Sequence, residues 1–409
     1  MSSPALVLHD RPTCRFAVNA LAGAVETHPA SRDVPVAVAR SPADVVRAIR
    51  AALEAGRRPV VGWSFFTASA VEVAAELAAV RAAIPDPRVL HLAGGAHATG
   101  APEATLRAGF DLAASGEGEE TLPRLLAALA SGGDPRAVPG LAWLDGSALH
   151  TSGRAAPVDL DRFPPGAPRA GRAGPIEITR GCVWACRFCQ TPFLFRARFR
   201  HRGLGAVRDA IRAQRAARPA ARPLDVRFIT PSALSWGSSD GGCDLAAIEA
   251  LLAAAREEAG ARRIMFGTFP SELRPEHVSP RALALLLRHC DNRMVLVGAQ
   301  SGSDRLLSEM GRGHDVEAVR RAVAVALEAG FRPGVDYVFG LPGETEDDRV
   351  ATRRELERLA RAGARVHAHL FDPLPGTPWA SAPAGRLDPD TRALLARLHA
   401  GGRAYGEWR

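Results

Sequence analysis

Three cysteines lie close together in the middle of the chain. Cys182, Cys186 and Cys189 follow the spacing Cys-x3-Cys-x2-Cys, and the 409-residue chain has only six cysteines altogether. A short loop of this spacing can bring three thiolates to one centre and let backbone N–H groups face the bound group. Three thiolates can hold three irons of a cubane cluster, which leaves the fourth iron without a protein ligand. The spacing therefore predicts a [4Fe–4S] cluster with one open iron.

Two other uses of the cysteines fit the sequence less well. A structural zinc site needs four ligands, usually as two separated pairs, whereas Cys14, Cys243 and Cys290 are scattered singly. A disulfide framework is typical of small secreted domains, and this long chain with few cysteines shows no secretory signal. We therefore favour the cluster.

The segment from Gly181 to Gln190, with the aromatic Phe188 before its last cysteine, resembles the cluster loop of the radical SAM superfamily. The resemblance implies that S-adenosylmethionine chelates the open iron through its amino and carboxylate groups and is cleaved after one electron arrives. It also implies an electron donor such as a flavodoxin or a ferredoxin. The cofactors would carry the radical chemistry, and the protein would position them.

The second half of the chain alternates strand-like and helix-like segments. Six strands are predicted, at residues 176–179, 226–230, 263–267, 294–300, 335–340 and 365–371. Six strands match the partial (β/α)6 TIM-type barrel that the resemblance implies. Barrels of this kind carry their chemistry at the carboxyl ends of the strands.

Two of these strand ends resemble nucleoside-contact motifs of the family. Gln300 and Ser301 end the fourth strand, where the family contacts the ribose of S-adenosylmethionine. Gly340 and Glu344 follow the fifth strand in the string Gly-Leu-Pro-Gly-Glu-Thr, which borders the adenine in the family. Asp336 departs from the pattern, because a glycine is common at that position. The same string also fits a helix start, where acidic side chains complement the positive end of the helix.

The other strand ends are less typical of the family. Related proteins often have an acidic residue after the second strand to hold the amino group of the cofactor, and here Ser232 or Thr230 would substitute through a hydroxyl. Glu272 follows the third strand and would face cofactor or substrate. His367 and His369 alternate on one face of the sixth strand. We expect both in the barrel lumen, as substrate contacts or a general base.

The first third of the chain predicts a Rossmann-like, doubly wound parallel sheet. Strands are expected at residues 6–8, 34–39, 59–64, 89–92 and 111–114, with helices at 44–55 and 70–83. Repeated βα alternation of this kind gives a parallel sheet whose ligands bind at the carboxyl ends of the strands.

Those strand ends resemble the loops of the cobalamin-binding domain that precedes one large class of radical SAM domains. The candidate contacts are Ser64, Thr67, Gly94, Gly95 and Gly116. Glycines let a backbone approach a bulky ligand, and a serine at a strand end can hydrogen-bond its tail. The Asp-x-His-x-x-Gly motif that supplies a histidine to cobalt is missing after the first strand. We expect cobalamin without such a ligand; the alternative is a Rossmann-like domain that has lost its ligand.

Four regions are predicted along the chain. The cobalamin-binding-like domain spans residues 1–133, a linker with a small hairpin 134–174, the radical SAM core 175–380, and a C-terminal helical tail 381–409. No apolar run approaches the ~20 residues of a membrane span, so we expect a cytoplasmic protein.

All of the basic side chains are arginine, and the formal net charge is +8 at pH 7. The arginines are spread along the chain rather than clustered, which makes a nucleic-acid partner unlikely. The densest stretch, Arg196 to Arg202, lies just after the cysteine loop and either touches substrate or covers a surface.

The resemblance covers nearly the whole chain and implies a radical SAM enzyme. The leading function is cobalamin-dependent methyl transfer to an unreactive carbon of a small molecule or a peptide. One alternative is a cobalamin-free rearrangement, cyclisation or sulfur insertion. Another is a non-catalytic binding protein that responds to the cluster or to a corrinoid. Methylthiolation of RNA is disfavoured, because those enzymes carry three extra cysteines before the radical domain and this region has only Cys14.

Overall fold

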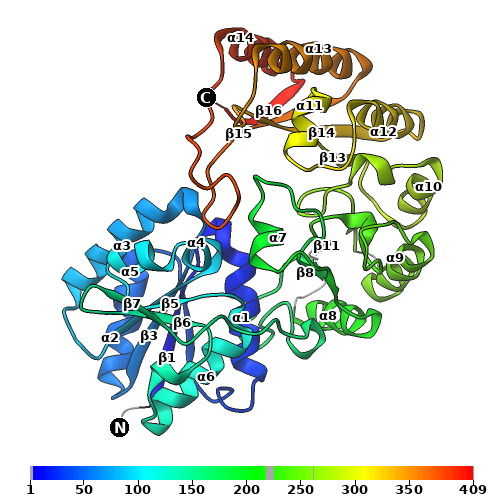
Figure 1. Ribbon diagram of the computed structural model, residues 1–409. Coiled ribbons are helices and arrows are strands. Elements are labelled where there is room, and N and C mark those ends of the chain that lie inside the picture. The colour runs from blue at the N-terminus through cyan, green and yellow to red at the C-terminus, as the bar shows by residue number, and fades with distance from the viewer. Residues whose placement is uncertain (1–2, 218–224, 261, 409) are drawn as a thin grey trace. The chain divides into compact units, whose positions relative to one another are not determined.

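The computed structural model describes residues 3–217, 225–260 and 262–408. The chain divides into two compact units (Figure 1). The first comprises Met1–Gly174 together with Ala216–Pro219, and the second comprises Pro175–Arg215 and Ala220–Arg409. No described helix is long and apolar enough to cross a membrane.

The first unit is built on one sheet with the strand order β2-β1-β3-β4-β5-β6-β7. The first five strands of the chain pair in parallel, and β6 and β7 add to the sheet in antiparallel fashion. The strands are β1 (Pro4–His9), β2 (Val36–Ala39), β3 (Arg58–Ser64), β4 (Leu90–Gly94), β5 (Leu112–Ala114), β6 (Leu141–Asp145) and β7 (Ala148–Thr151).

Helices cover both faces of this sheet, because apolar side chains alternate along the strands (Figure 1). Leu6 and Val60 pack against α1 and α6, whereas Val7 and Val61 pack against α2 and α3. The helices are α1 (Arg15–Thr27), α2 (Pro42–Glu54), α3 (Ala70–Ala83), α4 (Gly95–Gly100), α5 (Pro102–Arg107) and α6 (Gly118–Ser131).

The predicted doubly wound sheet is confirmed, but the hairpin is more than part of a linker. The strand β6 pairs with β5, and β7 pairs with β6, so the hairpin extends the sheet. Leu141 is fully buried in the core of this unit, and that burial draws the hairpin onto the sheet edge.

The second unit contains the partial barrel. Two sheets, β12-β11-β8 and β13-β14-β15-β16, consist of parallel strands, and a parallel bridge between Leu273 and Val297 links the segment after β12 to β13. The strands are β8 (Ile176–Glu177), β11 (Val226–Ile229), β12 (Ile264–Met265), β13 (Met294–Gln300), β14 (Arg332–Phe339), β15 (Arg365–Leu370) and β16 (Ala404–Glu407).

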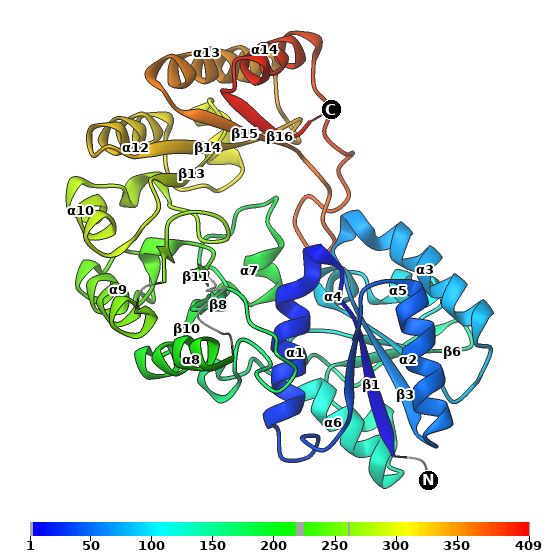
Figure 2. The ribbon, with the colours of Figure 1, turned by 180° about the vertical axis from the view of Figure 1, so that it is seen from behind.

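Helices cover the outer face of the barrel strands (Figure 2). They are α8 (Leu204–Ala217), α9 (Leu245–Ala259), α10 (Pro280–His289), α11 (Asp304–Glu309), α12 (Val316–Glu328), α13 (Glu346–Ala362) and α14 (Pro389–Ala400). Val335, Tyr337 and Val366 pack in the core formed with these helices. Their neighbours Asp336 and His367 therefore point to the inner face, because side chains alternate along a strand.

Short elements complete this unit and the connections. A two-stranded antiparallel ribbon joins β9 (Thr179–Arg180) to β10 (Arg200–His201) and frames the cysteine loop and α7 (Gln190–Leu194). The 3-10 turns are η1 (Pro12–Cys14), η2 (Thr67–Ser69), η3 (Pro135–Ala137), η4 (Leu160–Arg162), η5 (Ala233–Ser235) and η6 (Pro275–His277).

The prediction of a purely helical C-terminal tail is wrong. The tail contains α14, but it then adds β16, which pairs in parallel with β15. Ala404 and Trp408 are buried in the barrel core. The last strand is therefore held by this packing as well as by its backbone pairing with β15. The six predicted barrel strands are therefore joined by a seventh.

Candidate functional site

The cysteine loop leaves β9 at Gly181 and ends where α7 begins, directly after Cys189. Gly181 has φ +83°, and a Cβ there would lie 2.0 Å from Arg198 O, so the entry to the loop needs glycine. Burial, and next the neighbouring Cys189 and Cys186, raise the pKa of Cys182 to about 11. A metal would have to displace the proton of Cys182.

A buried arginine lies beside these thiols. Arg312 Nη1 donates to Cys186 Sγ at 3.6 Å, and its Nη2 donates to Gly298 O at 2.8 Å. The Arg274 guanidinium lies 3.8 Å from the centre of the Trp184 ring and donates to Arg312 O. Arg312 Nε and Trp184 Nε1 are buried without a hydrogen-bond partner among the described residues. Neither arginine was predicted as a site residue, although Arg312 stands between two glycines.

Phe188 and Gln190 connect the loop to the far strands of the barrel. Phe188 packs against an apolar cluster that includes Leu306, Leu341 and Phe371. Gln190 Nε2 donates to Pro375 O at 2.7 Å. The cysteine loop therefore lies at the carboxyl ends of β13, β14 and β15, where the sequence had placed the nucleoside contacts.

Gln300 lies at the carboxyl end of β13 in an unusual backbone conformation. Its φ of +74° is in the left-handed region, which costs a non-glycine residue about 1–3 kcal/mol and is common at functional sites. A Cβ on Gly298 would lie 3.0 Å from both Gln300 Nε2 and Arg312 Nη2. Gln300 and Arg312 thus converge over Gly298. Ser301 is buried, and its hydroxyl accepts from Ser303 N within the following turn.

Gly340 and Glu344 lie where β14 turns toward α13. Gly340 has φ +70°, and a Cβ there would meet Arg386 N at 2.4 Å, so the chain's own backbone requires glycine here. Glu344 accepts from Gly340 N at 3.2 Å. Burial raises the pKa of Glu344 to about 7. Thr345, with Asp348, forms the capping box of α13, which confirms the helix-start interpretation of this string.

Ser232 and Thr230 are engaged within their own turn after β11. Ser232 Oγ lies 2.8 Å from Ser235 Oγ, and Thr230 Oγ1 donates to Ser232 O at 3.0 Å. Both residues are buried. Each hydroxyl already has a local hydrogen-bond partner.

Glu272, Asp336, His367 and His369 form a polar group in the second unit. His367 Nδ1 lies 2.7 Å from Asp336 Oδ1 and 3.1 Å from His369 Nε2. Burial raises the pKa of Glu272 to about 8 and that of Asp336 to about 7. Burial also lowers the pKa of His369 to about 4. At neutral pH both acids thus have reduced charge and His369 is neutral. The expected lumenal position of the two histidines agrees with the alternation along β15.

The predicted corrinoid contacts gather at the carboxyl ends of β3, β4 and β5. A Cβ on Gly95, which has φ +89°, would lie 2.9 Å from Ser64 Oγ. Gly94 has open space beside it, with Ala114 as its near neighbour at 4.0 Å, and Gly116 has φ +105°. Gly94 therefore leaves room at this edge for a bulky ligand, which fits a corrinoid. Gly116 is required by its backbone conformation instead, since a Cβ there would meet Ala155 and Arg154 of the chain itself at 3.5 and 3.6 Å.

The two histidines near these loops have partners within the protein. His97 Nδ1 lies 3.2 Å from Thr67 Oγ1, and its ring packs on Phe65. His9 is buried against Trp63, and Glu76 lies 3.8 Å from its ring nitrogen. The Thr67 hydroxyl, a predicted corrinoid contact, thus already has His97 as a hydrogen-bond partner.

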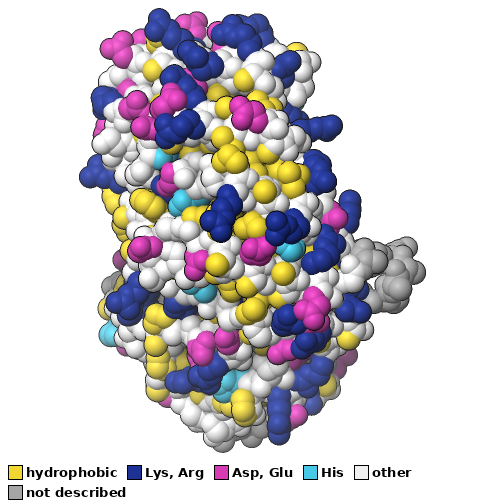
Figure 3. Space-filling model, turned by 90° about the vertical axis from the view of Figure 1, so that its right-hand side faces the viewer, with side chains coloured by type: hydrophobic (Ala, Val, Ile, Leu, Met, Phe, Trp, Pro, Cys, Tyr) yellow, Lys and Arg dark blue, Asp and Glu magenta, His cyan; other side chains and the backbone are white. Residues whose placement is uncertain are grey.

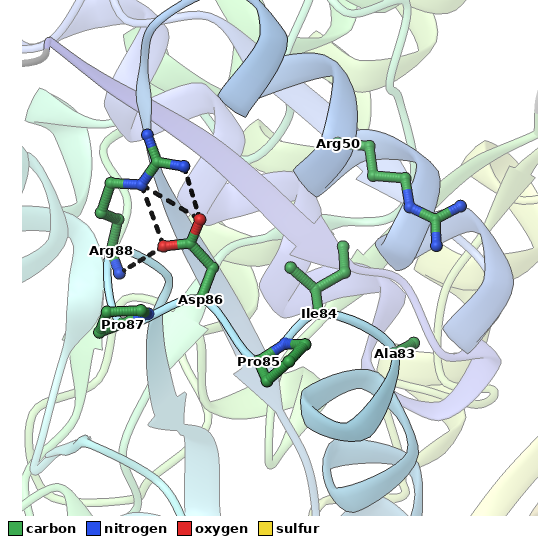
Figure 4. A pocket seen from close by; sticks show the side chains of 7 residues that line it. All are labelled: Arg50, Ala83, Ile84, Pro85, Asp86, Pro87 and Arg88. Atoms are coloured by element: carbon green, nitrogen blue, oxygen red, sulfur yellow. Dashed lines mark hydrogen bonds and ion pairs between the residues drawn. The ribbon is translucent and has the colours of Figure 1, made fainter.

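The first unit also has a pocket of about 500 Å³ away from these strand ends (Figure 4). Ile84, Pro85 and Pro87 line it, in the connection that leads into the amino end of β4. The Asp86 and Arg88 side chains at its edge pair with each other at 2.6 Å. The residues that line the pocket include no cysteine or histidine.

Arginine and acidic side chains are interspersed on the face shown in Figure 3. Over the described residues as a whole, many arginines form ion pairs, among them Arg320 with Glu355 at 2.7 Å. Such mixing agrees with the scattered arginines of the sequence and gives this face no basic stripe of the kind that nucleic acids favour.

Two family models match the chain, one in each unit. The model of the Radical SAM superfamily matches residues 176–356, and that of the B12 binding domain matches residues 15–126. The chain carries a Radical SAM domain and, before it, a B12-binding domain. The cysteine loop lies within the first match, and the strand ends of Ser64, Gly94 and Gly116 lie within the second.

Curated relatives match only part of their length. A tRNA-2-methylthio-N(6)-dimethylallyladenosine synthase of Desulfosudis oleivorans is 33% identical over 197 residues, which are 47% of this chain and 40% of that protein. Its counterpart from Halorhodospira halophila is 30% identical over 268 residues, 62% of this chain and 53% of that protein. The chain thus spans about half the length of these relatives or less.

Solved structures share the fold over nearly the whole chain. The radical S-adenosylmethionine methyltransferase TsrM from Kitasatospora setae, with cobalamin and a [4Fe-4S] cluster bound, has a TM-score of 0.69 at 19% identity and covers 93% of this chain and 74% of its own. The cobalamin-dependent S-adenosylmethionine radical enzyme OxsB has a TM-score of 0.65 at 14% identity, covering 87% of this chain and 52% of its own. These likenesses confirm the two-part α/β architecture.

Proposed function

We propose that this protein is a radical SAM enzyme that cleaves S-adenosylmethionine reductively and uses cobalamin to methylate an unreactive carbon. The observation that carries the proposal is the combination of a three-cysteine loop at the strand ends of a partial barrel with a B12-binding domain in one chain. The TsrM structure, solved with cobalamin and a cluster, shares this architecture.

Cys182, Cys186 and Cys189 would hold the [4Fe–4S] cluster, which when bound supplies the electron that breaks a carbon–sulfur bond of S-adenosylmethionine. Arg312 would stabilise the negative charge on Cys186, to which it already donates. Its Nε and Trp184 Nε1, which have no hydrogen-bond partner in the part of the chain that the structure describes, would bind the carboxylate of the cofactor. An external electron donor of the flavodoxin or ferredoxin class would reduce the cluster.

The B12-binding domain would carry cobalamin at the carboxyl ends of β3, β4 and β5. Gly94 leaves space for the ligand, and Ser64 Oγ lies at the same edge. Cobalamin when bound would take up a methyl group from S-adenosylmethionine and pass it on. The substrate is proposed to be a small molecule or a peptide.

Sulfur insertion is the second candidate, because the curated relatives are tRNA methylthio synthases at 30–33% identity. The B12-binding domain favours methylation over it, since sulfur insertion does not need a corrinoid. The two products differ in elemental composition: methylation adds CH2 alone, whereas methylthiolation also adds sulfur.

Anaerobic reconstitution with iron, sulfide and cobalamin, followed by S-adenosylmethionine with a labelled methyl group, tests the proposal without knowledge of the substrate. We expect one cluster and one cobalamin per chain, production of 5′-deoxyadenosine after reduction, and recovery of the label with the corrinoid. The Cys186→Ala variant should abolish 5′-deoxyadenosine but keep cobalamin.

Two results would contradict the proposal. Cluster and cobalamin retained without any cleavage of S-adenosylmethionine would indicate a binding protein. Cleavage with no retained corrinoid, and no label in it, would indicate a cobalamin-free radical enzyme.

A further inference from the structure

The inner face of the barrel carries donor atoms that the cysteine loop does not use. Asp336 on β14 is paired in register with His367 on β15, and their Oδ1 and Nδ1 atoms are 2.7 Å apart. His369 Nε2 lies 3.1 Å from the same Nδ1. All three donor atoms lie within 4.8 Å of one another. One carboxylate oxygen and two imidazole nitrogens thus converge on one point.

The spacing of these atoms is close to that of a metal site. Imidazole nitrogen and carboxylate oxygen bind Zn²⁺ at about 2.0–2.2 Å, so neighbouring donors around one ion lie about 3–3.5 Å apart. Small side-chain rotations would open the observed separations to this range. His367 Nδ1 faces both Asp336 Oδ1 and His369 Nε2, and a cation placed among them would engage all three atoms.

Neighbouring side chains hold the ligands in place. Glu272 neighbours Asp336, and the Tyr405 ring stacks on His367 with centroids 4.5 Å apart and an angle of 13°. Metal-ligating carboxylates and histidines are normally oriented by such outer contacts. Asp336 is only 4% exposed, so it is not one of the loose surface acids that often cluster without a metal.

The surrounding charges also admit a cation. Glu407 on β16 stands opposite His369 in register, and its negative charge acts on the imidazole. Arg312 is the opposing positive charge, and it is already directed to Gly298 O and Cys186 Sγ. The site is therefore adjacent to the cysteine loop in the fold but uses a separate set of donors.

We propose that Asp336, His367 and His369 bind a divalent transition-metal ion distinct from the group held by the cysteines. Two imidazoles and one carboxylate suit Zn²⁺, Fe²⁺ or Co²⁺ better than Ca²⁺ or Mg²⁺. Three protein ligands leave a coordination position open, as in catalytic metal sites. That position is available to water or to an oxygen or nitrogen donor of the substrate. The proposal does not depend on cobalamin or on the methylation reaction.

Metal titration of the full-length chain tests the site. Because the cysteines also bind metals, the titrations use Cys182→Ser/Cys186→Ser/Cys189→Ser protein beside the wild type, both treated with a chelator. We expect one Zn²⁺ per chain by calorimetry in the triple variant. Co²⁺ should give visible absorption bands without the near-ultraviolet thiolate band. Asp336→Asn, His367→Ala and His369→Ala should each weaken Zn²⁺ binding at least tenfold, and Glu272→Gln should weaken it less.

The His150→Ala variant is the matched control, since His150 lies on the exposed strand β7 of the other unit; it should bind Zn²⁺ like its parent. Circular dichroism melting confirms that each variant is folded. Failure of the folded triple variant to bind Zn²⁺ would overturn the proposal and leave a hydrogen-bonded Asp–His–His chain. Equal Zn²⁺ binding in the folded His367→Ala and His369→Ala variants would overturn it as well.

Discussion

Cys186 is the most enclosed of the three clustered cysteines. It is 4% exposed, and its sulfur contacts both Gly311 O and the Arg312 guanidinium. A positive group beside sulfur stabilises the thiolate that metals require. Cys243, in contrast, is exposed, and Cys290 is buried among apolar side chains of the barrel core.

Replacing Cys186 with Ala should abolish the iron–sulfur cluster, because the loop supplies only three thiolates and the cluster needs all of them. Cys243→Ala should keep full iron and sulfide content and serves as the control. Iron analysis and the visible spectrum after anaerobic reconstitution measure the cluster content of both variants. A full cluster in Cys186→Ala, or a lost cluster in folded Cys290→Ala, would show that the assignment is wrong.

Gln300 combines a strained backbone with a position next to Arg312, so we expect it to contact S-adenosylmethionine. Gln300→Ala should weaken binding of the cofactor by a few-fold to about tenfold, the value of one hydrogen bond to a neutral group. Calorimetry on the cluster-loaded protein measures this, with the exposed Ser308→Ala on α11 as control. Wild-type affinity in Gln300→Ala would remove this residue from the site, and the same test applies to Glu344.

The sequence reveals only those site residues whose signal is local. Three cysteines within eight positions form a readable pattern, and so does the string around Glu344. Arg312 and Arg274 reach the cysteine loop from more than 80 residues away in the chain. Glu272 and Asp336 likewise meet only after β12 and β14 have taken their places. No spacing rule connects such residues, because the fold brings them together.

The helix α13 depends on one buried carboxylate near its start. Asp348 accepts hydrogen bonds from Ser303 Oγ, Thr345 N and Thr345 Oγ1, and it pairs with Arg305. Burial alone would raise its pKa, but these donors hold the pKa of Asp348 well below its usual range. Asp348 thereby joins α13 to the turn after β13, which positions Gln300.

Asp348→Asn should lower the free energy of unfolding by about 2–3 kcal/mol at pH 7, since it leaves charged and polar partners unsatisfied. Because the folded-state pKa is depressed, the carboxylate contributes its stability above the unfolded pKa near 4 and loses it as the pH falls further. The difference between wild type and variant should therefore shrink below about pH 4. Urea unfolding across this range measures it, with the exposed Asp347→Asn as control. A pH-independent difference would contradict the assignment.

Strands with continuous apolar runs were predictable, and short or polar ones were not. The parallel strands β1 to β5 and β13 to β15 lie within a few residues of their predicted bounds. The strand β16 reads Ala-Tyr-Gly-Glu, which has no apolar run, and its Gly406 adopts φ +122° against the backbone of β15. Its pairing with β15 and the burial of Ala404 and Trp408 make it a strand. The hairpin β6–β7 was visible as a hairpin, but its attachment to β5 was not.

At the scale of the whole molecule, the chemistry of a bound cobalamin depends on whether a histidine of the B12-binding domain coordinates its cobalt. The chain lacks the Asp-x-His-x-x-Gly motif, and the structure shows what the nearby histidines do instead. His97 is held by Thr67 and Phe65, and His9 is buried against Trp63. Burial lowers the pKa of both rings. Each ring thus has protein partners that would have to be given up before it could reach a metal.

We therefore expect the full-length chain to bind cobalamin with no histidine of the protein on cobalt. Electron paramagnetic resonance of the reduced Co(II) form should show no nitrogen superhyperfine splitting from a protein imidazole, and His97→Ala should leave the spectrum unchanged. His150→Ala, on the exposed hairpin, is the control for removal of a histidine. Splitting that disappears in His97→Ala would show a ligated cobalt, because only loss of the coordinating nitrogen removes it. Failure of the wild-type chain to retain cobalamin would instead mean that the domain has kept the B12-binding fold without its ligand.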